Sequence, residues 1–229
     1  MSRRRALLTQ VAGGFDPLTY GAPIHAFWAE NPAQVLSGTV TSWTNSGASG
    51  VAALLENGSP SYVASAINGR PAIEFDGSSD LKVGYSTVIT KPGAMVAVAQ
   101  PDTLLGDNNI IDGQPGYRWG LGEGSGSWQA FAAAATTMSG GTPVAGEPVL
   151  LVADISTSGI FRVNGMQVFS GNSSTSGNDL QNLFIGSQYS DSDFWDGMIA
   201  FVAIYDAEIT TESWFSEYED GLIDHYGIT

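Results

Sequence analysis

The sequence predicts an all-β domain that ends in a short helix. Its 229 residues are 43% hydrophobic and include 29 Gly and 10 Pro, a composition that supplies turns between many strands. The run 196–206 is apolar on both faces of a strand. Asn164-Gly165 stands between two alternating runs, which is the strongest short signal for a β-hairpin. Sandwiches of this length commonly form one domain, so we assign residues 23–229 to a single β domain.

The run 196–206, Asp-Gly-Met-Ile-Ala-Phe-Val-Ala-Ile-Tyr-Asp, is the strand around which the other elements are organised. Alternation places four side chains on each face, with Met198, Ala200, Val202 and Ile204 on one and Ile199, Phe201, Ala203 and Tyr205 on the other. A strand that is apolar on both faces is covered on both sides. Gly197 and the β-branched residues favour a strand over a buried helix.

Shorter alternating or apolar segments predict the remaining strands. In chain order they are 24–29, 40–44, 62–67, 72–76, 94–100, 117–121, 128–133, 148–155, 160–163, 166–169 and 183–186. The segment 104–116 reads as a loop-rich insertion between two of them.

A helix is predicted from Thr210 to Tyr226. Its aromatic and aliphatic residues recur every four positions, at Trp214, Tyr218, Leu222 and Tyr226. Thr210 or Thr211 can cap the first turn, because a threonine hydroxyl accepts a hydrogen bond from a free backbone N–H.

Three motifs in the C-terminal half resemble those of a known family. In order, they are Phe161-Arg-Val-Asn-Gly165, Leu183-Phe-Ile-Gly186 and Trp195-Asp-Gly-Met-Ile-Ala-Phe-Val-Ala-Ile-Tyr-Asp206, followed by a helix that closes on Tyr226-Gly-Ile. They are similar to the C-terminal half of concanavalin A-like, laminin-G-type jelly rolls. Asn68 to Gly77 is similar to a motif of that family's first half. The resemblance covers about two-thirds of the chain and implies a two-sheet jelly-roll sandwich. It implies no single function, since lectins, glycosidases, receptor modules and virion proteins share the fold.

The chain is strongly acidic. Eight basic and 23 acidic residues give a net charge of −15, and three of the basic residues are Arg3, Arg4 and Arg5. The rest of the chain, with five basic and 23 acidic residues, therefore has a net charge of −18. Such a body repels nucleic acid and anionic lipid, so we expect neither as a partner. The sequence has no cysteine, which excludes disulfides and thiolate metal sites. His25 and His225 have no second ligand nearby in sequence, so we expect both to be ordinary polar residues.

Residues 1–22 predict an extended arm in front of the β domain. Ala6-Leu7-Leu8 runs straight into Thr9-Gln10, which leaves no apolar stretch long enough for a signal peptide. No run of about 20 apolar residues predicts a transmembrane helix, so we expect no membrane insertion. We expect a partner to order the arm through Arg3, Arg4 and Arg5. The alternative is that the arm lies on its own sandwich.

One pair of carboxylates matches part of a motif that glycosidases carry. Glucanases with this fold carry a Glu-x-Asp-x-x-Glu strand whose carboxylates serve as nucleophile, helper and acid. Glu74-Phe75-Asp76 matches the first two, but Gly77 to Asp80 provides no third carboxylate at the required register. Without that acid the reaction has no proton donor. We therefore predict no catalytic residue and no enzyme, with Glu74 and Asp76 as solvent-side residues that flank buried Ile73 and Phe75.

Aromatic and acidic residues in loops predict a candidate binding surface. The aromatic candidates for contact with a carbohydrate or a protein partner are Trp119, Trp128, Tyr189 and Phe194. Asp191 and Asp193 alternate on the loop 186–195, so they are candidate calcium ligands, with main-chain carbonyls completing the set. The alternative is a solvated acidic turn in which Trp195 fills the core.

The resemblance extends to laminin-G-like domains of tailed-bacteriophage particles, and it implies a non-enzymatic virion protein. As a head decoration or fibre component, the chain would contact capsid proteins through its arm. Its sandwich would then stabilise the particle or attach to a host-surface glycan. We expect synthesis in the host cytoplasm, location in the virion and a homo-oligomer. The alternative is a stand-alone carbohydrate-binding module. A glycoside hydrolase is a third possibility, which the missing carboxylate argues against.

Overall fold

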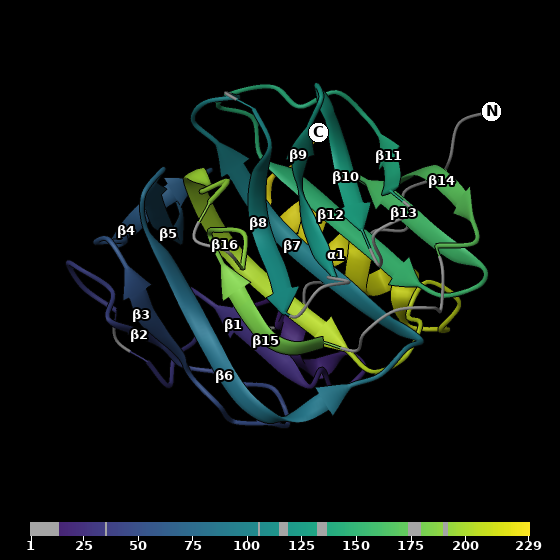
Figure 1. Cartoon of the computed structure of the whole chain (residues 1–229), viewed down its shortest axis with the longest axis horizontal. Coiled ribbons are helices and arrows are strands. Elements are labelled where there is room, and N and C mark those ends of the chain that lie inside the picture. Colours follow the sequence, from purple (N-terminus) through teal and green to yellow (C-terminus); the bar gives the residue numbers. More distant parts are fainter. Residues whose placement is uncertain are drawn as a thin grey trace.

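A computed structural model of the chain shows two antiparallel β-sheets packed face to face (Figure 1). The structure describes residues 14–34, 36–104, 106–114, 119–131, 137–173, 180–189 and 192–229, and only the backbone of residues 85–87 and 114. Within these residues each sheet has eight strands. No helix in the described part of the chain is long and apolar enough to cross a membrane. The predicted all-β sandwich is confirmed.

The first sheet has the strand order β14, β13, β12, β7, β16, β5 and β4, and β1 pairs with one end of β16. The bounds are β1 His25–Trp28, β4 Ser61–Ile67, β5 Arg70–Asp76, β7 Gly93–Pro101, β12 Val149–Ile155, β13 Gly159–Val163, β14 Met166–Gly171 and β16 Asp196–Tyr205. The predicted hairpin between β13 and β14 is confirmed. Asn164 and Gly165 have φ values of 49° and 76°, as a type I′ turn requires.

The second sheet has the order β11, β10, β9, β8, β15, β6, β3 and β2. The bounds are β2 Ser42–Trp43, β3 Ala53–Asn57, β6 Asp80–Ile89, β8 Asn108–Gln114, β9 Gly120–Gly124, β10 Ser127–Phe131, β11 Thr137–Gly140 and β15 Leu180–Ile185. The prediction of a loop-rich insertion over 104–116 is wrong for β8, which lies at the centre of this sheet. Its Ile110 and Ile111 are fully buried, and pairing with β9 and β15 overrides the turn-forming residues around them.

Strand β16 lies at the centre of the first sheet, between β7 and β5, and both of its faces are buried as predicted. A register shift between Ile199 and Phe201 interrupts the simple alternation. Ile199, Val202 and Ile204 therefore face the other sheet, whereas Ala200 and Phe201 face away from it. This corrects the predicted division of side chains between the two faces.

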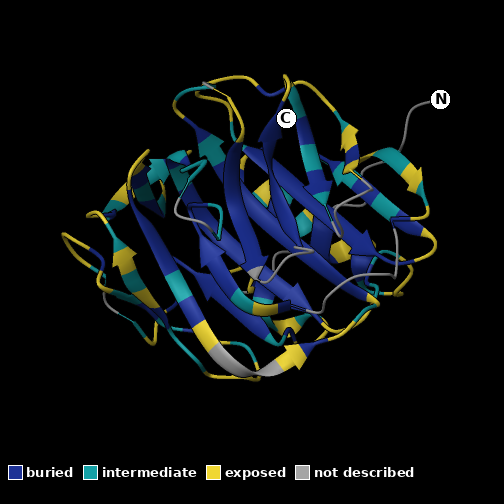
Figure 2. Cartoon of the chain, viewed as in Figure 1, coloured by how far each residue is buried: buried dark blue, intermediate teal, exposed yellow. Residues whose placement is uncertain are grey.

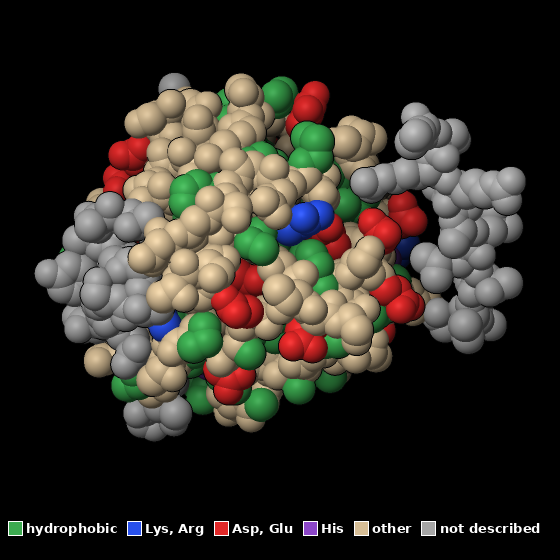
Figure 3. Space-filling view, turned by 90° about the vertical axis from the view of Figure 1, so that its right-hand side faces the viewer, with side chains coloured by type: hydrophobic (Ala, Val, Ile, Leu, Met, Phe, Trp, Pro, Cys, Tyr) green, Lys and Arg blue, Asp and Glu red, His purple; other side chains and the backbone are tan. Residues whose placement is uncertain are grey.

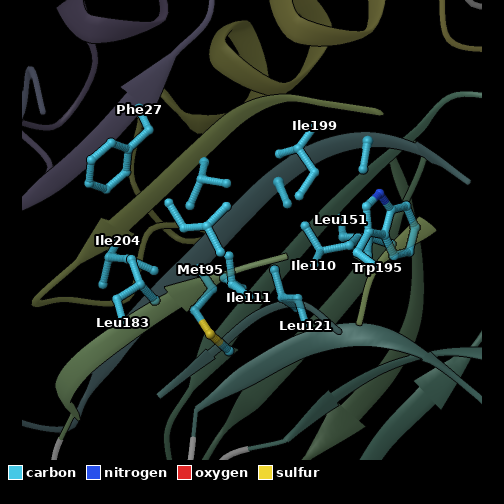
Figure 4. Close-up of a cluster of buried hydrophobic side chains, with 14 of the residues drawn as sticks. Phe27, Met95, Ile110, Ile111, Leu121, Leu151, Leu183, Trp195, Ile199 and Ile204 are labelled. Carbon is cyan, nitrogen blue, oxygen red and sulfur yellow. The ribbon is translucent and has the colours of Figure 1, made fainter. Parts of the chain in front are cut away.

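The main core fills the space between the sheets. Figure 4 shows side chains from both layers pointing toward one another, among them Met95 and Ile199 from the first sheet and Leu121 and Leu183 from the second. Figure 2 shows that buried residues fill the central strands, while exposed residues gather at turns and at the edges of the sheets. This packing holds the ends of the strands in fixed positions.

A second core lies on the outer face of the first sheet, under α1 (Phe215–Tyr226). Tyr218, Leu222 and Tyr226 are fully buried, so the predicted apolar face of the helix is confirmed. The helix begins five residues later than Thr210, however, and its N-cap Trp214 provides no side-chain hydrogen bond. Thr210 instead binds Asp154 of β12 through its backbone N–H and its hydroxyl.

Residues 14–22, which the sequence assigns to the arm, pack against this second core. A short 3-10 helix, η1 (Pro17–Thr19), begins at Asp16, and Phe15, Leu18 and Tyr20 contact the apolar residues around α1. The ring of Phe15 occupies the space beside Gly221, where a Cβ atom would lie 2.2 Å from Phe15 Cε2. This part of the arm therefore lies on its own sandwich. Arg3, Arg4 and Arg5 lie outside the described residues.

Candidate binding rim

The loop 186–195 joins β15 of the second sheet to β16 of the first, and we call its described residues, 186–189 and 192–195, the rim loop. It closes on itself, because the backbone N–H of Trp195 donates to the carbonyl of Gly186 at 2.8 Å and that of Gln188 to Ser192 at 2.8 Å. Gly186 has a φ of 93°, and a Cβ atom there would lie 2.4 Å from the ring of Phe75. The loop is thus held against the core at its start.

Two fully buried aspartates fix the rim loop to the second sheet. Asp80 of β6 accepts hydrogen bonds from the backbone N–H of Asn57 at 3.0 Å and from the Ser187 hydroxyl. Asp112 of β8 accepts from the backbone N–H of Tyr189 at 3.2 Å. A carboxylate is buried at little cost only when it is hydrogen-bonded, so these contacts order the loop.

Neither anchor was predicted from the sequence. The available signal was the presence of a carboxylate beside an apolar run, Ile110-Ile111-Asp112 in one strand and Asp80-Leu81 in the other. Because the partners of each aspartate lie far away in sequence, this signal alone did not point to the loop.

The predicted aromatic surface is only partly present. Tyr189 and Phe194 lie in the rim loop and are half-buried, and Phe194 forms an isolated bridge with Asn109 of β8. Trp119 and Trp128 are 0% and 3% exposed, so they are core residues and the structure corrects their assignment to a binding surface. Trp128 packs against Trp195 with a centroid distance of 6.4 Å, and Trp119 lies against Gly93.

The predicted calcium pair is not assembled in the described residues. One oxygen of the Asp193 carboxylate accepts a hydrogen bond from the Gln188 side-chain amide at 2.9 Å, and Asp191 lies outside the described residues. Within the described ranges, no group of three or more His, Cys, Asp or Glu side chains could hold a metal ion. Calcium prefers six to eight oxygen ligands, and the described residues provide only one carboxylate of the pair, so the calcium pair stays a prediction.

Glu123 adds a second acidic group at this end of the second sheet. It pairs in register with Asn108 and is 6% exposed. One carboxylate oxygen accepts from the backbone N–H of Gly126 at 3.2 Å, and the other is buried with no hydrogen-bond partner in the described part of the chain. Burial and the nearby charge of Asp107 raise the pKa of Glu123 above its ordinary value.

The outer face of the second sheet adjoins the rim loop, and no described helix covers it (Figure 1). Lys82, Phe184 and Asp112 lie side by side across three adjacent strands of this face. The Lys82 ammonium lies 5.1 Å from the centre of the Phe184 ring and 2.9 Å from a Glu56 carboxylate oxygen. The rim therefore combines two half-buried rings, amides and carboxylates with one lysine that is already engaged.

Glu74 and Asp76 lie elsewhere, on β5 of the first sheet, and flank fully buried Ile73 and Phe75 as predicted. Glu74 accepts a hydrogen bond from the Ser61 hydroxyl at 3.0 Å. Burial alone would raise the pKa of Asp76, but hydrogen bonds from Ser78 and Ser79 outweigh it and leave the pKa below its ordinary value. A carboxyl with a lowered pKa is ionised at neutral pH and is a poor proton donor.

The comparisons define the class of protein. A family model described as the concanavalin A-like lectin/glucanases superfamily matches residues 99–213, which is half of the chain. The chain belongs to this superfamily. No curated protein sequence matches it.

Several solved structures share the fold. Domain 4 of AbnA, a GH43 extracellular arabinanase from Geobacillus stearothermophilus, in complex with arabinotriose, is 15% identical with a TM-score of 0.62, over 87% of this chain and 97% of that one. Trypanosoma rangeli sialidase in complex with sialic acid is 16% identical with a TM-score of 0.62, over 88% of this chain and 32% of that one. The binding domain of botulinum neurotoxin serotype D/C is 9% identical with a TM-score of 0.61, over 87% of this chain and 52% of that one. At these identities the likeness shows the fold alone.

Proposed function

We propose that the protein is a non-enzymatic carbohydrate-binding module that binds glycans at the rim loop. The observation that carries the proposal is the likeness to domain 4 of AbnA, a structure that contains arabinotriose and matches this chain over 97% of its own length. The likeness thus extends over nearly the whole of that domain.

The geometry of the rim supports this proposal. Tyr189 and Phe194 are half-buried, so each ring can keep one part packed and offer another to a ligand. The buried carboxylates of Asp80 and Asp112 hold the loop that carries them. Because the loop is already ordered, binding a sugar would lose little loop entropy.

The first sheet supports a function without catalysis. The position that would hold the third carboxylate of a glucanase strand is Ser79, which is fully buried. Asp76 has a lowered pKa, so it is a poor proton donor, and Glu74 accepts a hydrogen bond from Ser61. We expect no release of reducing sugar from any glycan that the protein binds.

A glycan array tests the module directly, with binders then measured by calorimetry in calcium and in chelator. We expect Tyr189→Ala and Phe194→Ala each to weaken binding by about two- to tenfold, the range expected for losing one stacked ring. Tyr62→Ala is the matched control, because Tyr62 is a half-buried tyrosine on β4 of the other sheet. Unchanged affinity in both rim variants, with folding intact, would remove the rim from the proposal.

The virion role predicted from the sequence stays a proposal, supported by the sequence resemblance and by the acidic body. In it, residues upstream of 14 attach to capsid proteins and the sandwich faces outward. We expect the protein to co-purify with particles at a copy number that matches capsid symmetry. A protein lacking residues 2–13 that still attaches to particles would place the anchor elsewhere.

A further inference from the structure

The basic side chains of the β domain are few, and those in the described residues already have partners. The ion pairs are Arg70–Glu30 at 3.2 Å, Lys82–Glu56 at 2.9 Å and Arg162–Glu219 at 2.7 Å. Lys91 also has an interaction partner. The part of the chain beyond Arg5 has only five basic residues against 23 acidic ones. Within the described residues, a negatively charged ligand would therefore find Arg70, Lys82 and Arg162 already paired with carboxylates.

The candidate rim is acidic at close range. Asp193 lies in the rim loop, and its backbone carbonyl accepts from Asn109 at 3.0 Å. Glu123 pairs in register with the adjacent Asn108, so a second carboxylate lies on the other side of β8. Lys82, on a strand next to β15, is engaged with Glu56 and with the Phe184 ring. Away from the rim, on the right-hand side of the molecule in Figure 1, Figure 3 likewise shows several acidic side chains and few basic ones.

From this charge distribution we infer that the glycan bound at the rim is neutral, and that glycans bearing carboxylate or sulfate groups are rejected. This inference rests on the proposed function. Recognition of an anionic group in proteins relies on Arg or Lys, whose charge-assisted hydrogen bonds match carboxylate and sulfate oxygens. The described rim instead carries the half-buried Asp193 carboxylate, with Asp80, Asp112 and Glu123 buried nearby, and like charges that approach within a Debye length repel one another. Hydroxyl groups of a neutral sugar, in contrast, can donate to carboxylate and carbonyl oxygens.

The test compares one ligand in two charge states. A sialylated galacto-oligosaccharide is measured by calorimetry as the free acid and as its neutral methyl ester, beside neutral arabino- and galacto-oligosaccharides, all in chelator. We expect the neutral sugars or the ester to bind and the free acid to bind at least tenfold more weakly in 20 mM salt. In 1 M salt the difference should shrink, because the Debye length falls to about 3 Å.

Two charge variants locate the effect. Asp193→Asn removes one negative charge from the rim loop and should raise the affinity for the free acid more than that for the ester. Asp220→Asn removes the same charge from the exposed side of α1, on the opposite face of the first sheet, and should leave the ratio unchanged.

The outcomes separate this inference from the proposed function. Free acid that binds as tightly as the ester, with or without calcium, overturns the inference and leaves the binding module standing. An array on which no glycan binds overturns the proposed function and the inference together. Neutral sugars that bind while the acid is rejected support both.

Discussion

Arg162 of β13 and Glu219 of α1 form a two-pronged ion pair, with Nε–Oε1 and Nη2–Oε2 distances of 2.7 Å. The Glu219 side chain is 6% exposed and the Arg162 side chain 21%. The guanidinium also lies 5.6 Å from the centre of the Phe215 ring. This pair connects the helix to the first sheet at a point where the rest of the contact is apolar.

Glu219→Ala should therefore destabilise the fold by about 2 to 3 kcal/mol, because it leaves a largely buried guanidinium without its partner. The exposure of Arg162 places the loss at the lower end of the range for buried pairs. Chemical denaturation measures it. Replacing both residues, in Arg162→Met with Glu219→Leu, should cost less than the single change, and a larger cost for the double variant would contradict this explanation.

Gly221→Ala should destabilise the protein by about 1 to 3 kcal/mol, because the new methyl group would occupy the space of the Phe15 ring. In an ordinary helix the same change stabilises by about 1 kcal/mol. In a Phe15→Ala background, where the space is free, Gly221→Ala should therefore stabilise the protein instead of destabilising it. Thermal denaturation of the four proteins of this cycle, combined with limited proteolysis of residues 14–22, checks both expectations.

Stability should fall with acid because of His25. Its ring is buried, and its Nδ1 lies 2.8 Å from Asn45 Nδ2 and 3.0 Å from Ser49 Oγ. Burial lowers the pKa of His25 from 6.5 to about 4. The unfolded chain thus binds a proton that the folded chain does not, and stability declines as the pH falls from about 6.5 to about 4. The total loss should be about 3 kcal/mol.

The measurement is the free energy of unfolding across this pH range. His25→Asn should be less stable at pH 7 and should show a flatter profile. His225→Asn serves as the control, since it keeps His25 and should keep the steep part of the profile. Equal slopes in both variants would assign the acid sensitivity to other groups.

Glu123→Gln should stabilise the fold by about 1 kcal/mol at pH 7, because it removes an incompletely hydrogen-bonded carboxylate whose ionised form is disfavoured by burial. Because the pKa of Glu123 is raised in the folded protein, its contribution to stability is most favourable below the ordinary Glu pKa. That contribution is lost as the pH rises through the pKa of the folded state. The gain in the variant should therefore disappear in acid. A gain that persists at pH 3 would show another cause.

Asp80→Ala should loosen the rim loop, because Ser187 and Asn57 lose the carboxylate that accepts from both. We expect a loss of about 2 kcal/mol in unfolding free energy and faster hydrogen exchange in residues 186–195. Under the proposed function, glycan affinity should fall as well. Unchanged exchange in the loop would show that Asp112 alone is sufficient to hold it.

The elements with strong local patterns were predicted from the sequence, and those that depend on distant partners were not. Strand β16 and the Asn164-Gly165 turn follow from alternation and turn chemistry, which act over a few residues. Strand β8 was missed because Ile110-Ile111 is short and is bordered by Asn and Asp. Only pairing with β9 and β15 makes it a strand.

The same difference applies to the candidate site. Tyr189 and Phe194 lie on one loop and are half-buried, so they stay candidate binding residues. Trp119 and Trp128 are of the residue type that stacks on sugars, but they are buried. A sequence does not distinguish an exposed indole from one that fills a core. The buried anchors Asp80 and Asp112 have no local pattern at all, because their partners come from other strands.

Phe15 and Ile228 both pack in the layer formed by α1, so residue 14 and the last residues of the chain lie on the helix side of the first sheet. The outer face of the second sheet points the other way. A protein immobilised or fused through its C-terminus would therefore keep that face turned toward the solution. Such fusions suit sensor surfaces, and steric shielding by the support would not explain a failure to bind.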